Sequence, residues 1–376
     1  MKLFRCLILG LLLLCSYSAF SQVTDKEKAK LLRKIEREKR KLDMNYSLLV
    51  LPAIYYTPET NLAGGVTSMI TFKSNPKDSL CKTSQIIANA IYTLNDQILL
   101  NAPFQVFLDS NKWYLNGELA FYRYPYVFGG IGNDHEVDEV ENYSAYFPRF
   151  NSDILRRISG SVYGGGNFFY QNTTITEVER GGLLDSANIP GAQGSTTFGI
   201  GLSFFVDTRN DQLLPTKGWY VKYSTLHFTE FLGSNYAFNQ YTLDARWYKT
   251  VLKKHSVALN LFTEFQDGDV PFNRLSPLGG PFRMRGYLRG NYRDKQQAIL
   301  QAEFRSKQYW HHVAFRLFSA IGGVGDNPDV IAQNLRPTVG AGFRFTFKPD
   351  EKLYIRVDYG VGQNTSGFYV NVGEAF

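Results

Sequence analysis

The feature that most constrains this chain is a strict two-residue alternation of apolar and polar side chains near its C-terminus. Successive side chains of a strand point to opposite faces, so such a segment has one face in an apolar medium and the other in a polar one. The alternation predicts an all-β fold. Its apolar positions are Val339, Ala341, Phe343, Phe345 and Phe347, followed after a short turn by Leu353, Ile355, Val357 and Tyr359.

The same alternation recurs upstream, with arginine and carboxylate side chains on the face that is not apolar. Asp244 and Arg246 lie between the apolar positions of 241–247, and Asn260 and Glu264 lie between those of 257–265. A β-sandwich also buries one face of each strand, but its strands average about five or six residues. The runs in this chain are closer to the roughly 9–11 residues that a tilted membrane strand requires. Because an open edge in lipid leaves backbone groups unpaired, we expect the sheet to close into an antiparallel transmembrane β-barrel.

The connections between these strands alternate in length. Outer-membrane barrels have short periplasmic turns and long external loops. Short links at 109–112, 249–255 and 348–351 alternate here with long ones at 124–144, 176–195, 266–296 and 323–335. Counting from Tyr46, we predict a single barrel of about sixteen strands over residues 46–376, with no second folded domain.

The N-terminus has the features of a secretory signal peptide. Two basic residues precede an apolar run that ends at Cys15, and Ala19 and Ser21 supply small residues before the expected cleavage at Gln22. We therefore interpret residues 1–21 as the signal; a lipoprotein signal with Cys15 as the modified residue is the alternative. Residues 22–45 are expected to form a charged helical lead-in on the periplasmic side, because 25–43 interleaves acidic and basic side chains.

Composition agrees with an exported barrel and excludes several classes of function. Once the signal is removed, Cys81 is the single remaining cysteine, which excludes disulfides and cysteine metal sites. The formal charge is +7. We expect the basic residues to contact lumen carboxylates, lipid phosphates and loop surfaces, and we predict no nucleic acid as partner. An outer-membrane hydrolase is the enzymatic alternative, but none of the five histidines lies in a recognisable hydrolase motif. We therefore predict no enzymatic activity, no metal and no cofactor.

One stretch, residues 277–294, departs from the strand pattern because it is rich in both glycine and arginine. Glycine allows close backbone packing and positive φ, and arginine offers a planar fork of donors that keeps its charge. We expect this loop to fold into the barrel lumen and to pair there with carboxylates. A solvated surface loop is the alternative.

At this point the chain resembles a known family, the BamA/TamA outer-membrane assembly barrels, also called bacterial surface antigens. The most specific element is Met284-Arg285-Gly286-Tyr287, which is similar to the family's loop motif. The resemblance covers residues 46–376 and is carried by elements in family order. The others are Gly130-Ile131-Gly132-Asn133, the turn from Asp207 to Gly218, Glu303-Phe304-Arg305 and the closing Gly367–Phe376.

The resemblance implies a role for named residues in the lumen. In that family the loop arginine pairs with acidic residues on the following strands, which implies that Arg285 pairs with Glu303. Asp358 and Glu264 are further candidate partners. The family's second acidic residue belongs to a strand motif that this chain matches with alanine in place of the aspartate. The matching residues are Phe318, Ala320 and Gly322.

The last strand is implied to close the barrel. Residues 368–376 resemble the C-terminal recognition signal of barrels awaiting assembly, with its apolar face formed by Phe368, Val370, Val372 and Phe376. The family closes between its first and last strands through a short seam. A seam that parts offers an edge with which a client strand can pair.

The resemblance therefore implies an outer-membrane protein that contacts lipid and aids insertion or translocation of client outer-membrane or exported proteins. We expect a barrel-only member without the family's periplasmic POTRA modules, so that a periplasmic partner would replace them. The alternative is a passive channel or a structural outer-membrane barrel without assembly activity, which Ala320 and the expected lack of these modules favour.

Overall fold

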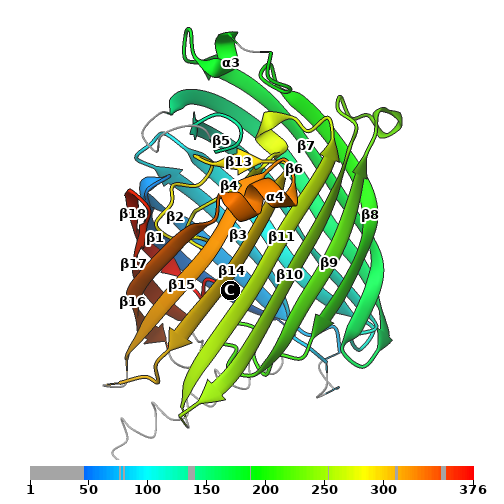
Figure 1. Cartoon of the computed structure of the whole chain (residues 1–376). Helices are drawn as coiled ribbons and strands as arrows, with labels where there is room; N and C mark the ends of the chain where they lie inside the picture. The colour runs from blue at the N-terminus through cyan, green and yellow to red at the C-terminus, as the bar shows by residue number, and fades with distance from the viewer. Residues whose placement is uncertain are drawn as a thin grey trace, which may run out of the picture. The chain divides into compact units, whose positions relative to one another are not determined.

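The computed structural model describes residues 46–75, 78, 81–133, 140–186, 188–252, 254–309, 312–348 and 353–376. The chain divides into two units, Met1–Ser47 and Leu48–Phe376. The predicted signal peptide and charged lead-in lie outside the described residues, and the second unit is a closed barrel (Figure 1).

Sixteen strands within the described residues form the barrel wall. Each pairs with the wall strands before and after it in the chain, and β18 pairs with β1, which confirms the predicted fold class and strand number. The wall consists of β1 Tyr46–Thr57, β2 Asn61–Phe72, β3 Ser84–Thr93, β4 Ile98–Leu108, β5 Trp113–Phe128, β6 Glu141–Ser159, β7 Val162–Val178, β8 Ser195–Asp207, β9 Gly218–Phe228, β10 Phe238–Val251, β11 His255–Gly268, β14 Gln296–Arg305, β15 Val313–Gly325, β16 Arg336–Lys348, β17 Leu353–Gly362 and β18 Thr365–Val372.

The remaining elements lie in the connections. β12 Ser276–Pro277 and β13 Arg293–Asp294 form a separate two-stranded sheet. Short helical segments are α3 Leu183–Ser186, η1 Glu230–Leu232, η2 Phe272–Arg274 and α4 Pro328–Gln333. In the part of the chain that the structure describes, no helix is both long enough and apolar enough to cross a membrane.

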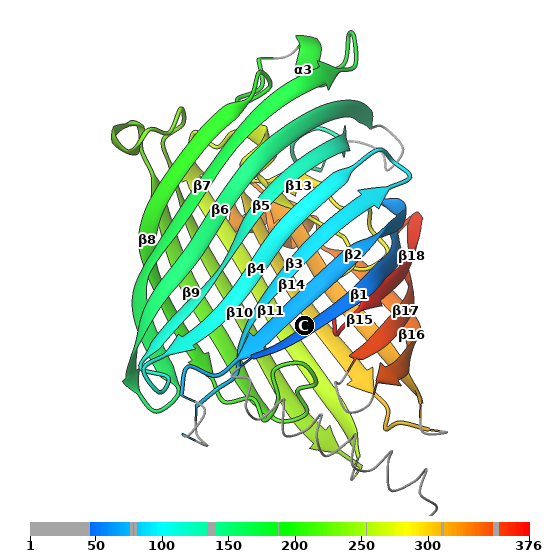
Figure 2. The same ribbon diagram turned by 180° about the vertical axis from the view of Figure 1, so that it is seen from behind.

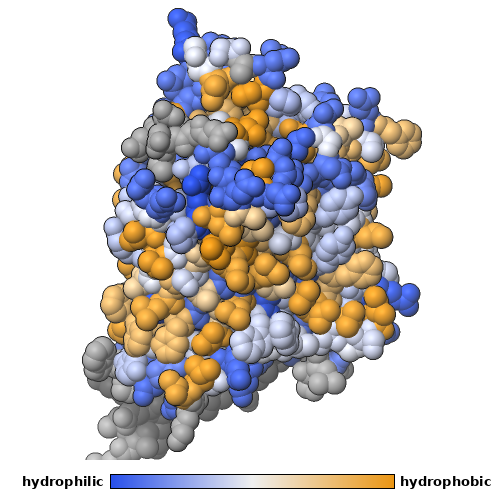
Figure 3. Space-filling model, in the orientation of Figure 1, coloured by the Kyte–Doolittle hydropathy of each residue, from blue (hydrophilic) through white to orange (hydrophobic). Residues whose placement is uncertain are grey.

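The two-residue alternation separates an outer face from an inner one. On β8, Leu202 is 58% exposed, whereas the next residue, Ser203, is fully buried. On β16, Val339 and Phe343 are 59% and 53% exposed. Apolar side chains cover the middle of the wall, and hydrophilic ones gather over the region of α4 above it (Figure 3). The apolar residues therefore face outward, as a lipid-facing wall requires.

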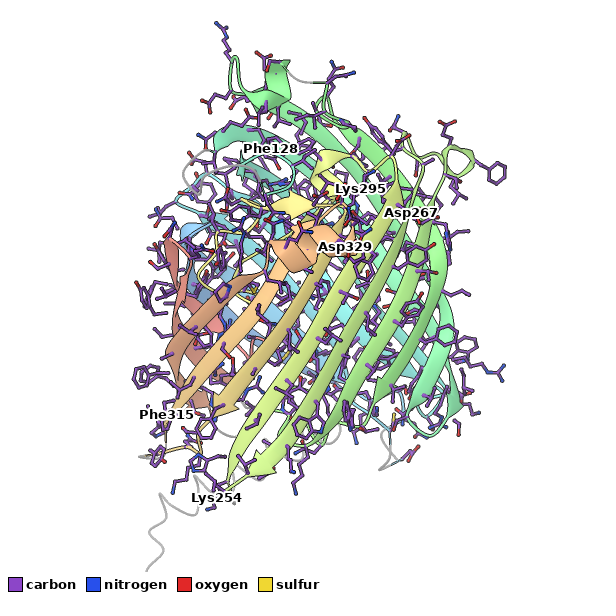
Figure 4. All side chains as sticks on the ribbon, viewed as in Figure 1. Phe128, Lys254, Asp267, Lys295, Phe315 and Asp329 are labelled. Atoms are coloured by element: carbon purple, nitrogen blue, oxygen red, sulfur yellow. The ribbon has the colours of Figure 1, made fainter. Side chains whose placement is uncertain are left out.

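Four long connections, those that follow β5, β7, β11 and β15, open at one end of the barrel. Figure 4 places Asp267, Lys295 and Asp329 at this long-loop end and Lys254 at the opposite, short-turn end. The predicted difference in connection length does not hold everywhere. Residues 58–60, 94–97 and 363–364 are short links at the long-loop end, and residues 208–217 form a longer link at the short-turn end.

The interior is less polar than the alternation alone suggests. Near the short-turn end, inward side chains of β4–β8 form a buried aromatic cluster in which Tyr114 stacks on Phe107 and Phe205. Leu155 and Tyr163 complete this cluster. The lumen is therefore filled with side chains along this part of the wall and is not a uniform water-filled pore.

Candidate functional site

The connection between β11 and β14 runs inside the barrel, as the glycine- and arginine-rich sequence predicts. β12 and β13 pair its two ends with each other. Between them, Met284 and Tyr287 are buried in a cluster with Ile299 of β14 and Val324 of β15. This segment, the lumen loop (278–292), is thereby packed against the inner wall.

The lumen loop approaches the wall too closely for side chains. Gly286 has a φ of 114°, and a Cβ on it would lie 3.0 Å from the main chain of Gly360 on β17. A Cβ on Gly360 would lie 2.5 Å from the carbonyl oxygen of Arg285. The Gly286 amide donates to the Tyr369 hydroxyl at 2.9 Å, and the Gly286 carbonyl oxygen accepts from the Thr365 hydroxyl at 3.0 Å. Glycine is therefore required on both sides of this contact.

Arg285 reaches two strands of the wall at once. Its Nη2 atom donates to Glu303 on β14 and its Nη1 atom to Asp358 on β17, each over 2.6 Å. Its guanidinium carbon lies 3.5 Å from the ring centroid of Phe318 on β15. All three charged side chains are almost completely buried. A buried pair of this kind is costly to break, because either partner alone is an uncompensated charge.

The two carboxylates also bind arginines of the wall. Glu303 lies 2.8 Å from Arg305 and 3.2 Å from Arg316. Asp358 lies 3.1 Å from Arg356. Within the described residues, the lumen loop is thus one arm of a continuous charged network and not one partner of an isolated pair.

A third carboxylate, Glu374, joins this network from beyond the end of β18. It lies 2.7 Å from Arg316 and 2.9 Å from Arg344. Burial alone would raise the pKa of Glu374, but Arg316 and Arg305 hold that pKa at about 2. Glu374 therefore stays ionised over the physiological range and binds the C-terminal segment to β15 and β16.

The placement of Phe376 contradicts the sequence-based prediction. β18 ends at Val372, and Gly373 has a φ of 89°, which turns the chain inward. Phe376 is 6% exposed and packs against Tyr248 and Ala258, and its main-chain oxygen accepts from Arg305. In both ribbon views the C-terminus lies within the outline of the barrel (Figures 1 and 2).

The physical reason for this turn is the charge at Glu374. Phe368 and Val372 are exposed on the outer face, with Val370 half-buried between them. Had the strand continued, Glu374 would have shared that face. A carboxylate exposed to hydrocarbon is costly, whereas the inward turn gives Glu374 three arginine neighbours. The outward face of the last strand therefore includes Phe368 and Val372 but not Phe376.

β15 contains the residues that match the family's strand motif, and they supply packing surfaces in place of a second carboxylate. Phe318 lies under the Arg285 guanidinium, and Ala320 contacts the apolar cluster around Met284. Gly322 lies against the main chain of β14, where a Cβ would be 2.7 Å from a carbonyl oxygen. Asp358, two strands further along the wall, provides the second acidic partner.

Glu264 was a candidate partner of Arg285, but the structure places its carboxylate against other side chains. Its carboxylate accepts from Gln240 at 3.0 Å and from Ser276 at 2.6 Å, both on neighbouring elements. It therefore fixes the start of the connection that carries the lumen loop and is no partner of Arg285. Within the described ranges, no three His, Cys, Asp or Glu side chains group closely enough to hold a metal ion.

The barrel closes between β1 and β18, and this seam is short (Figure 2). In the part of the chain that the structure describes, the two strands pair at one position, Tyr56 with Val370, whereas β17 and β18 pair at eight. The Tyr56 and Phe368 rings, 5.8 Å apart, add one contact across the seam. Pro52, within β1, has no N–H to donate.

Comparison with known proteins gives the family and the fold. The Omp85 superfamily domain matches residues 104–376. BamA from Haemophilus ducreyi, lacking POTRA domains 1–3, aligns with a TM-score of 0.58 at 13% identity, over 88% of this chain and 70% of that one. CdiB from Acinetobacter baumannii aligns at 0.56 and 14%, over 91% and 68%. CdiB from Escherichia coli aligns at 0.54 and 10%, over 86% and 62%. No curated protein sequence matches significantly.

Proposed function

Because the chain belongs to the Omp85 superfamily, as an outer-membrane β-barrel, we propose that it inserts or translocates proteins at the outer membrane through the seam between β1 and β18. The observation that carries this proposal is the single paired position, Tyr56 with Val370. Every other pair of neighbouring strands with a known register is joined at several positions, so the wall is weakest at this seam.

The register extends this argument to the rest of β1. Tyr56 lies opposite Val370, so Val372, the last residue of β18, falls opposite Ile54. Positions 46–53 of β1 lie beyond the end of β18. In lipid, each unpaired backbone group costs several kcal/mol. A client strand that pairs with β1 removes this cost through backbone hydrogen bonds alone, without covalent chemistry.

The buried charged network stabilises the strands on the β18 side of the seam. Arg285 connects the lumen loop to β14 and β17, and Glu374 connects the segment after β18 to β15 and β16. The strands from β14 to β17 are therefore joined inside the barrel as well as along their edges. This arrangement supports opening at β1 while the last strands keep their positions.

A passive channel is the second candidate function. Lumen cavities of about 310, 380 and 390 Å³ all have Phe282 of the lumen loop in their lining. Movement of Phe282 and its neighbours would join these cavities into an aqueous path, which would conduct ions without any client.

Depletion of the protein in its native bacterium, followed by a quantitative outer-membrane proteome, tests the proposed function. We expect other outer-membrane barrels or exported proteins to decline, and wild-type protein supplied in trans to restore them. Unchanged levels of all such proteins after depletion would contradict assembly and favour the channel.

A further inference from the structure

The lumen contains a second group of arginines that the Arg285 network does not use. A cavity of about 310 Å³ beside the lumen loop is lined by several arginines and a single carboxylate, Glu264. The lining therefore has an excess of four positive charges. The arginines, called the cavity arginines, are Arg149, Arg274, Arg283, Arg289 and Arg293.

Neutral oxygen atoms hold three of the cavity arginines in place. Arg149 donates to the side-chain oxygen of Gln171 at 2.9 Å, and Arg274 donates to that of Gln240 at 2.8 Å. Arg293 donates to main-chain carbonyl oxygens in the lumen loop and on β5. Such acceptors fix the direction of a guanidinium but do not cancel its charge.

Arg274 and Arg283 are the cavity arginines that stack most closely on aromatic rings. Arg274 stacks 4.0 Å from the ring centroid of Phe169, and its buried Nε has no hydrogen-bond partner among the described residues. Arg283 stacks 3.4 Å from the centroid of Phe262. A guanidinium that stacks on a ring keeps its N–H edge available to an acceptor in its plane.

The charges near these two arginines do not neutralise them. The nearest carboxylate to Arg283 is Asp244 at 4.0 Å, which Arg246 already binds at 2.5 Å. Burial lowers the pKa of Arg274 to about 10, and the nearby Arg149 adds to this effect. Burial likewise lowers the pKa of Arg283 to about 10. Both remain protonated at neutral pH, so the cavity carries a charge that favours an anion.

We propose that this cavity binds a phosphate-bearing anion, held in the planes of the Arg274 and Arg283 guanidinium groups. A ligand with one carboxylate would bring one charge and two oxygens, whereas the excess positive charge comes from donors on β6, η2, β13 and the lumen loop. Phosphate offers more charge and acceptor oxygens in several directions, which suits donors around a cavity. The ligand is either a soluble phosphorylated solute or the phosphorylated head group of a lipid.

Calorimetric titration of the purified full-length protein with inorganic pyrophosphate, in neutral detergent at low ionic strength, tests the proposal. We expect saturable binding that weakens at least about ten-fold in Arg274→Gln and in Arg283→Gln, because each removes a charge-assisted hydrogen bond. Arg209→Gln is the matched control. Arg209 is also a buried arginine that stacks on a ring, but it binds its own carboxylate, Asp207, at 2.9 Å.

A second arm separates the two sources of phosphate. Unfolding temperatures are compared in nanodiscs of phosphatidylcholine with and without phosphatidic acid. Stabilisation by phosphatidic acid that Arg274→Gln abolishes assigns the site to a lipid head group, and pyrophosphate binding assigns it to a soluble ligand. The proposal fails if wild type responds to neither probe, or if Arg209→Gln weakens the response as much as Arg274→Gln does. Neither result depends on whether the seam opens.

Discussion

Arg285 and Glu303 meet over 2.6 Å in the lumen, where neither side chain is more than 2% exposed. This contact joins the lumen loop to the barrel wall. Since Glu303 also binds Arg305 and Arg316, the carboxylate serves both the loop and the wall. The two partners are therefore unequal, and their removal has unequal consequences.

We predict that Glu303→Ala destabilises the barrel more than Arg285→Ala does. Loss of Arg285 leaves Glu303 with two other arginines, whereas loss of Glu303 leaves three buried arginines short of a counter-charge. Breaking a buried pair costs about 3–5 kcal/mol. Because the groups touch, the double variant should cost less than the sum of the single ones. Denaturant titration in detergent measures all three, and strict additivity would show that the groups do not interact.

Docking of the lumen loop depends on Gly286. In Gly286→Ala the new Cβ would lie 3.0 Å from the main chain of β17, at a φ of 114° that alanine rarely adopts. We expect the loop to leave its position and the conductance of the barrel in a planar bilayer to rise. Gly64→Ala on β2, where nothing lies within 4 Å of the new Cβ, is the control and should conduct as wild type does. Equal conductance of wild type and Gly286→Ala would mean that the loop does not obstruct the lumen.

The inward turn of the C-terminus makes a prediction about two phenylalanines. Phe376 is 6% exposed inside the lumen, and Phe368 is 44% exposed on the outer face. Phe376→Ala leaves a cavity among packed side chains and should cost about 3–5 kcal/mol. Phe368→Ala exchanges a contact with lipid and should cost less than half as much. The midpoint of the heat-induced mobility shift on gels compares the two, and the reverse order would place Phe376 at the lipid face.

Glu374 makes the stability of the barrel depend on pH in the acid range. Its pKa in the folded protein is about 2, below the ordinary value of 4.5. The stability contributed by its ionised form is therefore complete above about pH 4.5 and is lost as the pH falls from there toward about pH 2. We predict that wild type and Glu374→Gln differ most in unfolding free energy near neutral pH. Their difference should narrow across that acid range, and a difference independent of pH would contradict the assigned charge.

The barrel could be predicted from the sequence because lipid imposes a simple rule. Each strand of the wall must alternate between outward apolar and inward side chains, and segments such as Val339–Phe345 make that period visible without any long-range contact. The predicted location of the loop inside the lumen followed from glycine and arginine occurring together. Both inferences need only the order and the types of residues within a short segment.

The details of the site depend on registers and distances that no local pattern contains. Asp358 was one candidate among several, and Glu264 was wrongly weighed beside it, because period two assigns a face but not a height in the barrel. Gly360 and Gly362 on the inner face of β17 were a usable signal of close approach by another backbone. So was Glu374, which a continuous last strand would have directed into lipid.

The cavity arginines were still harder to predict. Arg149 and Arg274 are far apart in sequence and meet through the closure of the barrel. The excess of positive charge appears only once the binding partners of the nearby carboxylates are known, such as Asp244, which binds Arg246 more closely than Arg283. A count of charges along the sequence cannot separate matched from unmatched arginines.

Opening of the seam is tested most directly by locking it. In a Cys81→Ala background, cysteines at Tyr56 and Val370 join β1 to β18, and cysteines at Tyr359 and Phe368 join β17 to β18 as the control. The measurement is the fraction of client barrel inserted into proteoliposomes, with the disulfide formed and then reduced. We predict that the Tyr56–Val370 lock abolishes insertion reversibly, whereas the Tyr359–Phe368 lock leaves it unchanged. Full insertion through the locked seam would contradict the proposed function.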